Sequence, residues 1–286
     1  AWKNEKLKLS DFKKLINNAS NLKVDLMVFG GAGEPLLHPE IIDIFKMASE
    51  KNIQIIVSTN AINLTKKVTD KLMQCNIKEL ICSLPAATIQ TYGTVNPMHN
   101  NINTFSKIIR NLKYFVHEKK FLKKECKLSM YHVIHNQNYH EISKMANMDL
   151  NIGVDLIRFS LIRLQKEFNY LKLTHSQIKS IEKSIDFLTK YLNDKPIELK
   201  NNIHFQLDNI QVQSGKWSGK ILKKWGCKIG YFFSLLLASG QLSLCCHVRE
   251  IGNINKTAFT DLWTSDYYNQ NRYKAKYIKN FKNTIF

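Results

Sequence analysis

The chain has 286 residues, which is long enough for one large α/β domain with a small appendage and for a sizeable core. Six cysteines, no signal peptide and no apolar stretch of membrane-spanning length exclude a disulfide scaffold and a membrane partner, and predict a reduced, cytoplasmic protein. The formal net charge of +19 is spread over lysines in nearly every segment, so a nucleic-acid or phosphate-binding α/β domain is kept only as an alternative.

The chain opens with a predicted helix that has Ser10 as its N-cap, followed by an apolar, β-branched strand over 24–29. Residues 30–39 then hold three glycines and two prolines before apolar residues recur at helical spacing. This pattern indicates a strand-to-helix turn, in which glycine permits positive φ and close approach of a ligand, and Pro39 suits a helix start. Glu34 lies just beyond the strand, where parallel α/β folds place their ligand groups, and its carboxylate suits a cation.

Strands and helices alternate after this turn. Continuous apolar, β-branched runs predict buried strands, and helical stripes or caps predict the helices between them. The expected strands cover 54–59, 79–84, 127–134 and 154–160, and the expected helices cover 65–74, 105–120, 139–150 and 174–192. Together with 24–29 these make five strands, whose short connections require a parallel sheet with right-handed crossovers. Because a (βα) barrel does not begin with a helix, we expect one further strand before residue 1.

Three histidines, at positions 132, 135 and 140, lie close together in the sequence. His132 and His135 are three residues apart on or just after a strand, so they are expected to face opposite sides of it. We therefore interpret these histidines as incidental rather than as a metal site.

The composition changes after Lys200, where glycine and tryptophan become frequent and long helical stripes stop until Phe259. Cys227 is followed after twelve residues by Gly240, and after four more by Cys245. The segment 231–244, with its turn at Ser239–Gly240, predicts a β-hairpin. A hairpin returns the chain so that the two thiols can approach each other, and soft thiolates suit an iron–sulfur cluster, although two buried structural thiols are the alternative.

The sequence GGAGEPLLHPEI at 30–41 resembles the GGEP-type motif of radical S-adenosylmethionine enzymes. In that family the glycine backbone and the glutamate receive the α-amino group of the methionine moiety of the cofactor. The resemblance extends to Asn60, which matches the family's TNG turn with Ala61 in place of glycine, so a left-handed conformation there would carry strain. Cofactor-binding residues implied by the resemblance are Gly30, Gly31, Gly33, Glu34, Pro35, Ser58, Asn60 and Ser83.

Ser83 belongs to the segment CSLPAATIQTY, which resembles the family's ISIDAATPETY segment with Pro85 where aspartate is more usual. The resemblance places its hydroxyl at the mouth of the barrel, where it would bind a ribose. The alternative is a small residue that fills the barrel interior.

The spacing of Cys227, Gly240 and Cys245 resembles the opening of the SPASM-type auxiliary cluster domain. The segments 251–254 and 259–265 resemble the IGNI and F…IW parts of the same domain. The resemblance implies that Cys227 and Cys245 ligate an auxiliary iron–sulfur cluster, while the adjacent Cys246 is off the pattern and would point the other way along a strand. The family's remaining cysteines are expected after residue 286.

The resemblance implies a partial (βα)6 TIM-like barrel missing its first strand over 1–200, truncated at its N-terminus. A small α+β domain with the hairpin, truncated at its C-terminus, is expected over 201–286. The implied enzyme cleaves S-adenosylmethionine at a [4Fe–4S] cluster, whose CxxxCxxC ligands are expected upstream, so this piece alone is expected to be inactive. The resulting 5′-deoxyadenosyl radical would abstract hydrogen from a peptide, protein or small molecule, with electrons from a flavodoxin or ferredoxin.

The alternative from another class is a non-catalytic barrel that binds a partner or peptide. A CxxxCxxC motif in the upstream reading frame favours the enzyme, and its absence favours the binder. No catalytic residue is assigned, and nothing between Asp155 and Cys227 decides the substrate.

Overall fold

The computed structural model describes residues 6–278 except 32, 98–101, 165, 209–221, 223 and 246–249. The chain divides into two compact units, each with its own β-sheet. The barrel unit comprises residues 27–42 and 54–217, and the cysteine unit comprises residues 1–26, 43–53 and 218–286. Among the described helices, none combines the length and the apolar character needed to cross a membrane. The domain division expected at Lys200 stays a prediction, and the two compact units divide the chain at other points.

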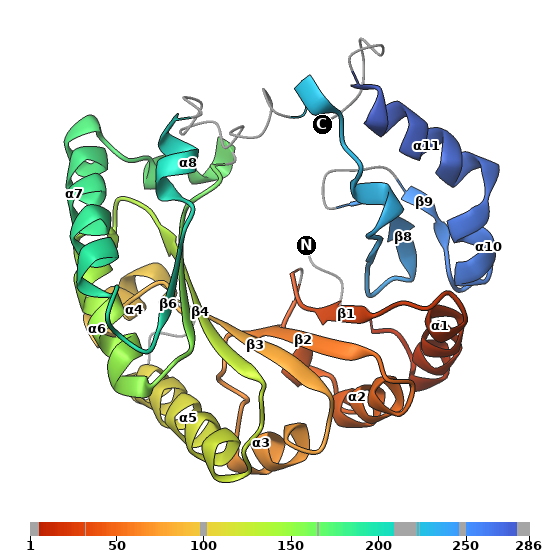
Figure 1. The fold of residues 1–286 in the computed structure, drawn as a ribbon, viewed down its shortest axis with the longest axis horizontal. Coiled ribbons are helices and arrows are strands. Elements are labelled where there is room, and N and C mark those ends of the chain that lie inside the picture. Colours follow the sequence, from red (N-terminus) through yellow and green to blue (C-terminus); the bar gives the residue numbers. More distant parts are fainter. Residues whose placement is uncertain are drawn as a thin grey trace. The chain divides into compact units, whose positions relative to one another are not determined.

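The barrel unit is built on a six-stranded sheet in which the strands follow one another in chain order (Figure 1). Its strands are β1 (Leu26–Phe29), β2 (Gln54–Thr59), β3 (Ile77–Ser83), β4 (Lys127–Ile134), β5 (Leu156–Leu161) and β6 (Glu198–Asn201). The pairs from β2 to β6 are parallel. Sequential parallel order with a helix in each connection is the arrangement of a partial (βα)6 barrel, as predicted.

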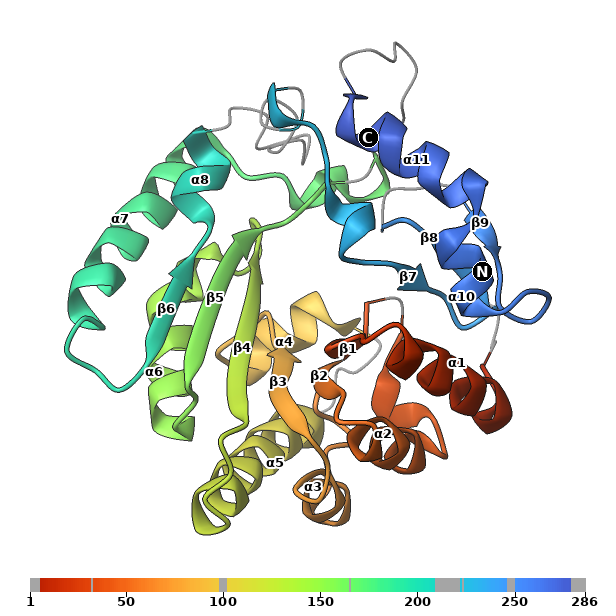
Figure 2. The ribbon, with the colours of Figure 1, turned by 45° about the vertical axis from the view of Figure 1, so that its right-hand side comes forward.

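Helices cover the outer face of this sheet, as Figures 1 and 2 show for α3, α5, α6 and α7. The helices of the connections are α2 (Ile41–Glu50), α3 (Lys66–Leu72), α4 (Ile89–Val95), α5 (Ile102–Phe121), α6 (Ile142–Ile152), α7 (His175–Tyr191) and α8 (Ile203–Asp208), with the short 3-10 helices η1 (Pro35–Leu37), η3 (Tyr139–Glu141) and η4 (Lys166–Leu171). His132 of β4 is hydrogen-bonded to Asp149 of α6, which identifies the helix-facing side of the strands. Ser58, Tyr131 and Arg158 have the opposite parity, so they face the inside of the barrel.

The predicted strands are all present, but the sequence analysis missed β6, which pairs with β5 through Leu156 and Glu198 among others. The strand expected before residue 1 lies outside this chain and stays a prediction. The predicted N-cap Ser10 was wrong, because α1 (Leu9–Asn21) has Lys8 at its N-cap and Ser10 lies in its first turn. Gly153, with φ of 84°, ends α6, and Thr174, which forms a capping box with Gln177, begins α7.

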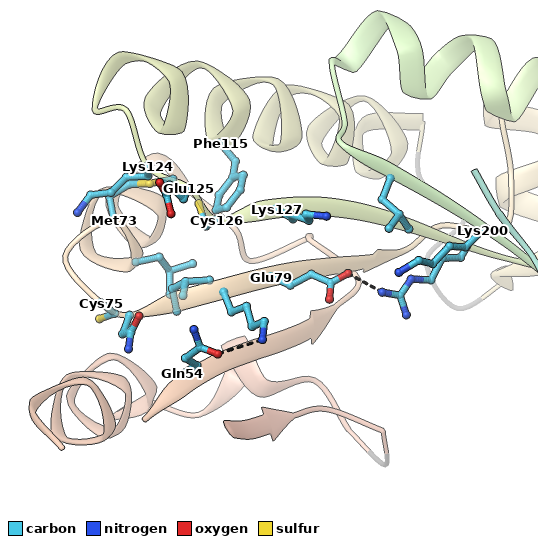
Figure 3. Close-up of a pocket in the computed structure, with 16 residues that line it drawn as sticks. Gln54, Met73, Cys75, Glu79, Phe115, Lys124, Glu125, Cys126, Lys127 and Lys200 are labelled. Carbon is cyan, nitrogen blue, oxygen red and sulfur yellow. Dashed lines mark hydrogen bonds and ion pairs between the residues drawn. The ribbon is translucent and has the colours of Figure 1, made fainter. Parts of the chain in front are cut away.

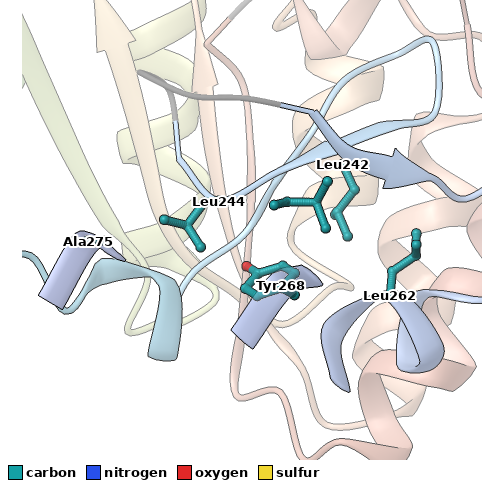
Figure 4. Packing of buried hydrophobic residues seen from close by; sticks show 6 residues of the cluster. Leu242, Leu244, Leu262, Tyr268 and Ala275 are labelled. Atoms are coloured by element: carbon teal, nitrogen blue, oxygen red, sulfur yellow. The ribbon is translucent and has the colours of Figure 1, made fainter. Parts of the chain in front are cut away.

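The cysteine unit contains the predicted hairpin, formed by β7 (Leu235–Leu236) and β8 (Gln241–Ser243). Gly240 turns the chain with φ of 84°, and β9 (Glu250–Asn253) adds a third antiparallel strand. Two helices follow, α10 (Phe259–Thr264) and α11 (Asp266–Lys276), and α10 packs against α1. The core of this unit consists of Leu242, Leu244, Ile251, Leu262, Tyr268 and Ala275 (Figure 4).

Arg272 fixes the two last helices around this core. Its guanidinium carbon lies 4.2 Å from the centre of the Trp263 ring and 4.1 Å from that of Tyr268. The same group donates hydrogen bonds of 2.8 Å to the carbonyls of Gly230 and Trp263. A guanidinium held between two aromatic faces with its donors paired is a stable way to bury this charge.

Candidate cofactor-binding site

The turn after β1 contains Gly30, Gly31 and Gly33 and is called the glycine turn below. It packs closely on β2 at Gly30 and is open at the other two glycines. A Cβ on Gly30, which has φ of 149°, would lie 2.6 Å from Cβ of Ser58, so only glycine fits there. Gly31 has φ of 103°. Apart from its chain neighbours, an added Cβ on Gly31 or Gly33 would meet no atom of the described residues within 4 Å. The turn therefore exposes backbone at two positions where a ligand can approach closely.

Glu34 joins this turn to the end of β2 through its carboxylate. Its Oε1 accepts hydrogen bonds from the Leu36 amide at 3.0 Å and from the Thr59 hydroxyl at 2.7 Å. Its Oε2 accepts one from the Asn60 amide at 2.7 Å. An ionised carboxylate has about four acceptor positions, so these three bonds leave one position on Oε2. Glu34 thus shapes the turn and keeps an acceptor for a cationic group.

The turn after β2 contains the strain that the sequence predicted. Ala61 is fully buried and adopts φ of 58°, in the left-handed region where the family has glycine. The Asn111 side-chain amide of α5 donates to the Ala61 carbonyl at 2.8 Å, and the Asn60 side-chain oxygen accepts from the Ile62 amide at 3.0 Å. Asn60 therefore contributes its backbone amide to Glu34 and its side-chain oxygen to its own turn.

Ser58 and Ser83 lie on the inner face of neighbouring strands. In the β2–β3 register Ser58 pairs with Ile81, two residues before Ser83. The Ser83 side chain is exposed at the end of β3, as a hydroxyl at the mouth of the barrel must be. Binding of a ribose by these hydroxyls stays a prediction.

Two residues that the sequence analysis missed hold the segment after β3. Glu141 accepts hydrogen bonds from the Ala87 amide at 2.8 Å and the Thr88 hydroxyl at 2.7 Å. Burial alone would raise the pKa of Glu141, but these bonds outweigh it and hold the pKa below its usual value. The side-chain amide of Asn138 donates to the Pro85 carbonyl at 2.9 Å. No local pattern could reveal these contacts, because the partners lie more than fifty residues apart in the chain.

His132 and His135 are buried within the fold. His132 is fully buried between the Leu84 carbonyl, 2.6 Å from Nδ1, and Asp149, 2.7 Å from Nε2. His135 is also buried, which lowers its pKa to about 4. Within the described part of the chain, no three His, Cys, Asp or Glu side chains are grouped so that they could hold a metal ion.

Cys227 and Cys245 both belong to the cysteine unit, and the core of this unit is shown in Figure 4. The Cys227 amide donates to the Ala275 carbonyl at 2.9 Å, and the side chain packs against the core. Cys245 is buried directly after Leu244. Neither cysteine is in a disulfide. Their role as cluster ligands stays a prediction, and Cys246 lies outside the described residues.

The position before Cys227 allows only glycine. Gly226 has φ of 73°, and a Cβ there would lie 1.9 Å from the Lys276 carbonyl oxygen. This contact and the bond from the Cys227 amide to the Ala275 carbonyl hold the chain against the end of α11.

Comparison with known proteins gives the family. The model of the Radical SAM superfamily matches residues 2–148, and the SPASM model, an iron–sulfur cluster-binding domain, matches residues 227–284. The tungsten-containing aldehyde ferredoxin oxidoreductase cofactor-modifying protein of Pyrococcus furiosus is 23% identical in an alignment of 282 residues that covers 93% of this chain and 74% of that protein.

Two solved structures share the fold. SuiB of Streptococcus suis matches with a TM-score of 0.68 and 16% identity, over 96% of this chain and 62% of SuiB. Native anSMEcpe with bound AdoMet matches with a TM-score of 0.67 and 14% identity, over 94% of this chain and 75% of anSMEcpe. The radical SAM domain binds S-adenosylmethionine and a [4Fe–4S] cluster, and the SPASM domain binds auxiliary iron–sulfur clusters. The chain belongs to the radical SAM superfamily and carries a SPASM domain at 227–284.

Proposed function

We propose that the barrel unit holds the methionine end of S-adenosylmethionine at the glycine turn, and that the enzyme cleaves this cofactor reductively. The observation that supports the proposal is the Glu34 carboxylate, which has one acceptor position left beside two open glycines. When bound, the family's cofactors supply a 5′-deoxyadenosyl radical, which abstracts hydrogen from the substrate.

The residues of this chain fit the cofactor's polar groups. Glu34 Oε2 would accept a charge-assisted hydrogen bond from the α-ammonium group, and the backbone at Gly31 and Gly33 leaves room beside it. Ser58 and Ser83, on the inner face of the barrel unit, would bind the ribose hydroxyls. Pro35 begins η1 and fixes the exit of the turn.

We further propose that Cys227 and Cys245 ligate an auxiliary iron–sulfur cluster. Both cysteines belong to the cysteine unit, in which Cys245 is buried, Cys227 packs against the core, and the Cys227 amide is bonded to Ala275 near the end of α11. Thiolates suit such clusters. Two cysteines are fewer than the four ligands of a complete site, so other groups would complete the coordination.

Two substrate classes are supported. SuiB has been crystallised with the precursor peptide SuiA, and anSMEcpe with the Kp18Cys peptide, which supports a peptide or protein substrate. The curated relatives are a cofactor-modifying protein and an AdoMet-dependent heme synthase of Methanosarcina barkeri, which supports a small molecule. A flavodoxin or ferredoxin is proposed as electron donor.

The test uses the protein of the complete reading frame, purified without oxygen and reconstituted with iron and sulfide. Glu34→Ala is expected to weaken S-adenosylmethionine binding by roughly 1.5–3 kcal/mol, or about ten- to a hundredfold in Kd, because a charge-assisted acceptor is lost. The control is Glu50→Ala, which removes an exposed carboxylate at the end of α2. An unchanged Kd for Glu34→Ala, with the circular dichroism spectrum preserved, excludes Glu34 from the site.

The same preparation separates the enzyme from the non-catalytic alternative. With dithionite as reductant, the enzyme forms 5′-deoxyadenosine from S-adenosylmethionine. A protein that binds the cofactor and forms none above a no-protein control is a binder.

A further inference from the structure

A cavity of about 660 Å³ lies at the end of the barrel unit opposite the glycine turn. It is lined by residues that begin the strands, including Gln54 of β2, Lys127 of β4 and Leu156 of β5 (Figure 3). Glu34 and Ser83 follow or end their strands, so the cavity is a separate site. Its volume is within the range of small-molecule sites, about 300–1,000 Å³.

Cationic side chains outnumber acidic ones in the lining of this cavity. The lining includes five of them, Lys78, Lys124, Lys127, Arg158 and Lys200, and two carboxylates, Glu79 and Glu125. Even with the nearby Glu198 counted, the positive groups outnumber the negative ones. A concave surface with excess charge of one sign focuses its potential and attracts counter-ions.

The positive groups are also incompletely paired by the protein. Lys127 and Lys200 share one carboxylate, that of Glu198, at 3.5 and 3.4 Å. The Lys78 ammonium group donates to the neutral Gln54 at 3.0 Å (Figure 3). Two ammonium groups around one carboxylate leave most of their donors available to a ligand.

Arg158 adds a hydrogen-bond donor that is not used within the described part of the protein. Its Nη2 donates to Glu79 at 2.8 Å, and Glu79 also accepts from the Ser129 hydroxyl. Its Nε is buried and has no partner among the described residues. A buried donor without a partner is costly, so native proteins usually satisfy it with a ligand or water. Arginine binds carboxylate and phosphate oxygens with particular preference.

We propose that this cavity binds a small polyanion, a phosphorylated or polycarboxylate molecule, with an oxyanion bound by Lys127, Lys200 and Arg158. The inference is independent of the function proposed for the glycine turn, because the two sites share no residue. The proposal gives a binding role to the cationic residues of the cavity, and assigns none to the lysines scattered over the rest of the chain.

Pyrophosphate and citrate are the probes, titrated into the chain by calorimetry at constant ionic strength with chloride as background. The cavity variant Lys127→Gln/Lys200→Gln is expected to raise the Kd of the bound probe about tenfold or more, because two charge-assisted bonds are lost. The control variant, Lys179→Gln/Lys183→Gln on the exposed side of α7, removes the same charge and is expected to change the Kd less than about twofold. Preference for pyrophosphate identifies a phosphorylated ligand, and preference for citrate a polycarboxylate.

A second variant, Arg158→Lys, keeps the positive charge beside Glu79 but lacks Nε, and is expected to weaken binding with an unchanged melting temperature. Glu34→Ala is expected to leave probe binding unchanged, so failure at one site is distinguishable from failure at the other. Equal losses in the cavity and control variants, or no saturable binding of either probe, overturn the proposal.

Discussion

The Thr59 hydroxyl donates a 2.7 Å hydrogen bond to Glu34 Oε1, and so joins the last residue of β2 to the turn that follows β1. The same hydroxyl accepts a 3.0 Å bond from the Ala61 amide. One side chain therefore orients the carboxylate and holds the strained turn beside it. Thr59 was not among the predicted site residues, and we infer that it is a positioning residue for Glu34.

Thr59→Val is expected to raise the Kd of S-adenosylmethionine about fivefold in the complete, reconstituted protein. The substitution keeps the side-chain volume but removes a hydrogen bond worth about 1 kcal/mol, so Glu34 becomes less ordered. Thr59→Ser keeps the hydroxyl and is expected to bind as the wild type does. If Thr59→Val binds with an unchanged Kd, Glu34 does not depend on this contact.

Gly33→Ala tests whether the open side of the turn is used by the cofactor. The free energy of unfolding is expected to change by no more than about 0.5 kcal/mol, because among the described residues an added Cβ meets no atom within 4 Å beyond its chain neighbours. The Kd of S-adenosylmethionine is expected to rise, because the methyl group occupies space proposed for the ligand. Urea unfolding and equilibrium binding measure the two effects.

Gly30→Ala is the matched comparison. Its φ of 149° and the 2.6 Å approach to Ser58 make any side chain strained, so it is expected to destabilise the fold by about 1–3 kcal/mol. A Gly33→Ala protein that is as stable as the wild type and binds the cofactor equally well contradicts the proposed position of the ligand.

The glycine turn and its glutamate were predictable because their signals are local. Three glycines and two prolines in ten residues, placed between an apolar strand and a helical stripe, leave few other structures. Gly153 and Thr174 also act locally, because they end and begin helices through contacts with their own neighbours. Ser10 shows the limit of such signals, because a suitable cap residue occurs inside the first turn of α1.

What the sequence did not reveal depends on distant contacts. The strand β6 has the sequence ELKN, in which polar residues dominate, and it is ordered by its pairing with β5. Thr59 and Glu141 owe their roles to partners 25 and more than fifty residues away. Side chains of this kind look like ordinary polar residues until the fold brings their partners together.

The free energy of unfolding is expected to fall in acid because of the buried His135. Burial lowers its pKa from 6.5 to about 4, and its Nδ1 accepts a 3.3 Å hydrogen bond from the Gln137 amide, which protonation would break. The unfolded state therefore binds a proton between these pH values while the folded state does not. Stability is complete above pH 6.5 and falls below it, by at most about 1.4 kcal/mol per pH unit from this group.

The measurement is urea unfolding of wild type and His135→Asn at pH 7, 6 and 5. Asparagine does not titrate and offers a side-chain oxygen to the same amide, so the variant is expected to lose less stability on acidification. His140→Asn changes an exposed histidine of the same segment and is expected to follow the wild type. Equal slopes for His135→Asn and wild type rule out His135 as the source.

Iron content tests the two cysteines of the SPASM domain. The complete, reconstituted protein is expected to bind more iron than one [4Fe–4S] cluster requires, and Cys227→Ala/Cys245→Ala is expected to lose only that excess. The substitutions keep the backbone bond from Cys227 to Ala275 and replace one thiol that packs against the core and one that is buried by small apolar side chains, so the unit is expected to stay folded.

Two single variants separate ligation from a structural effect. Cys246→Ala is expected to leave the iron content unchanged, because this position is off the family pattern. Gly226→Ala keeps both thiols but forces a Cβ to within 1.9 Å of the Lys276 carbonyl, so it is expected to displace Cys227 and lower the excess iron with no ligand removed. Loss of iron in Cys246→Ala to the same extent as in the double variant contradicts the assignment. Unchanged iron in the double variant shows that Cys227 and Cys245 are buried structural thiols, and leaves the barrel unit and its glycine turn unaffected.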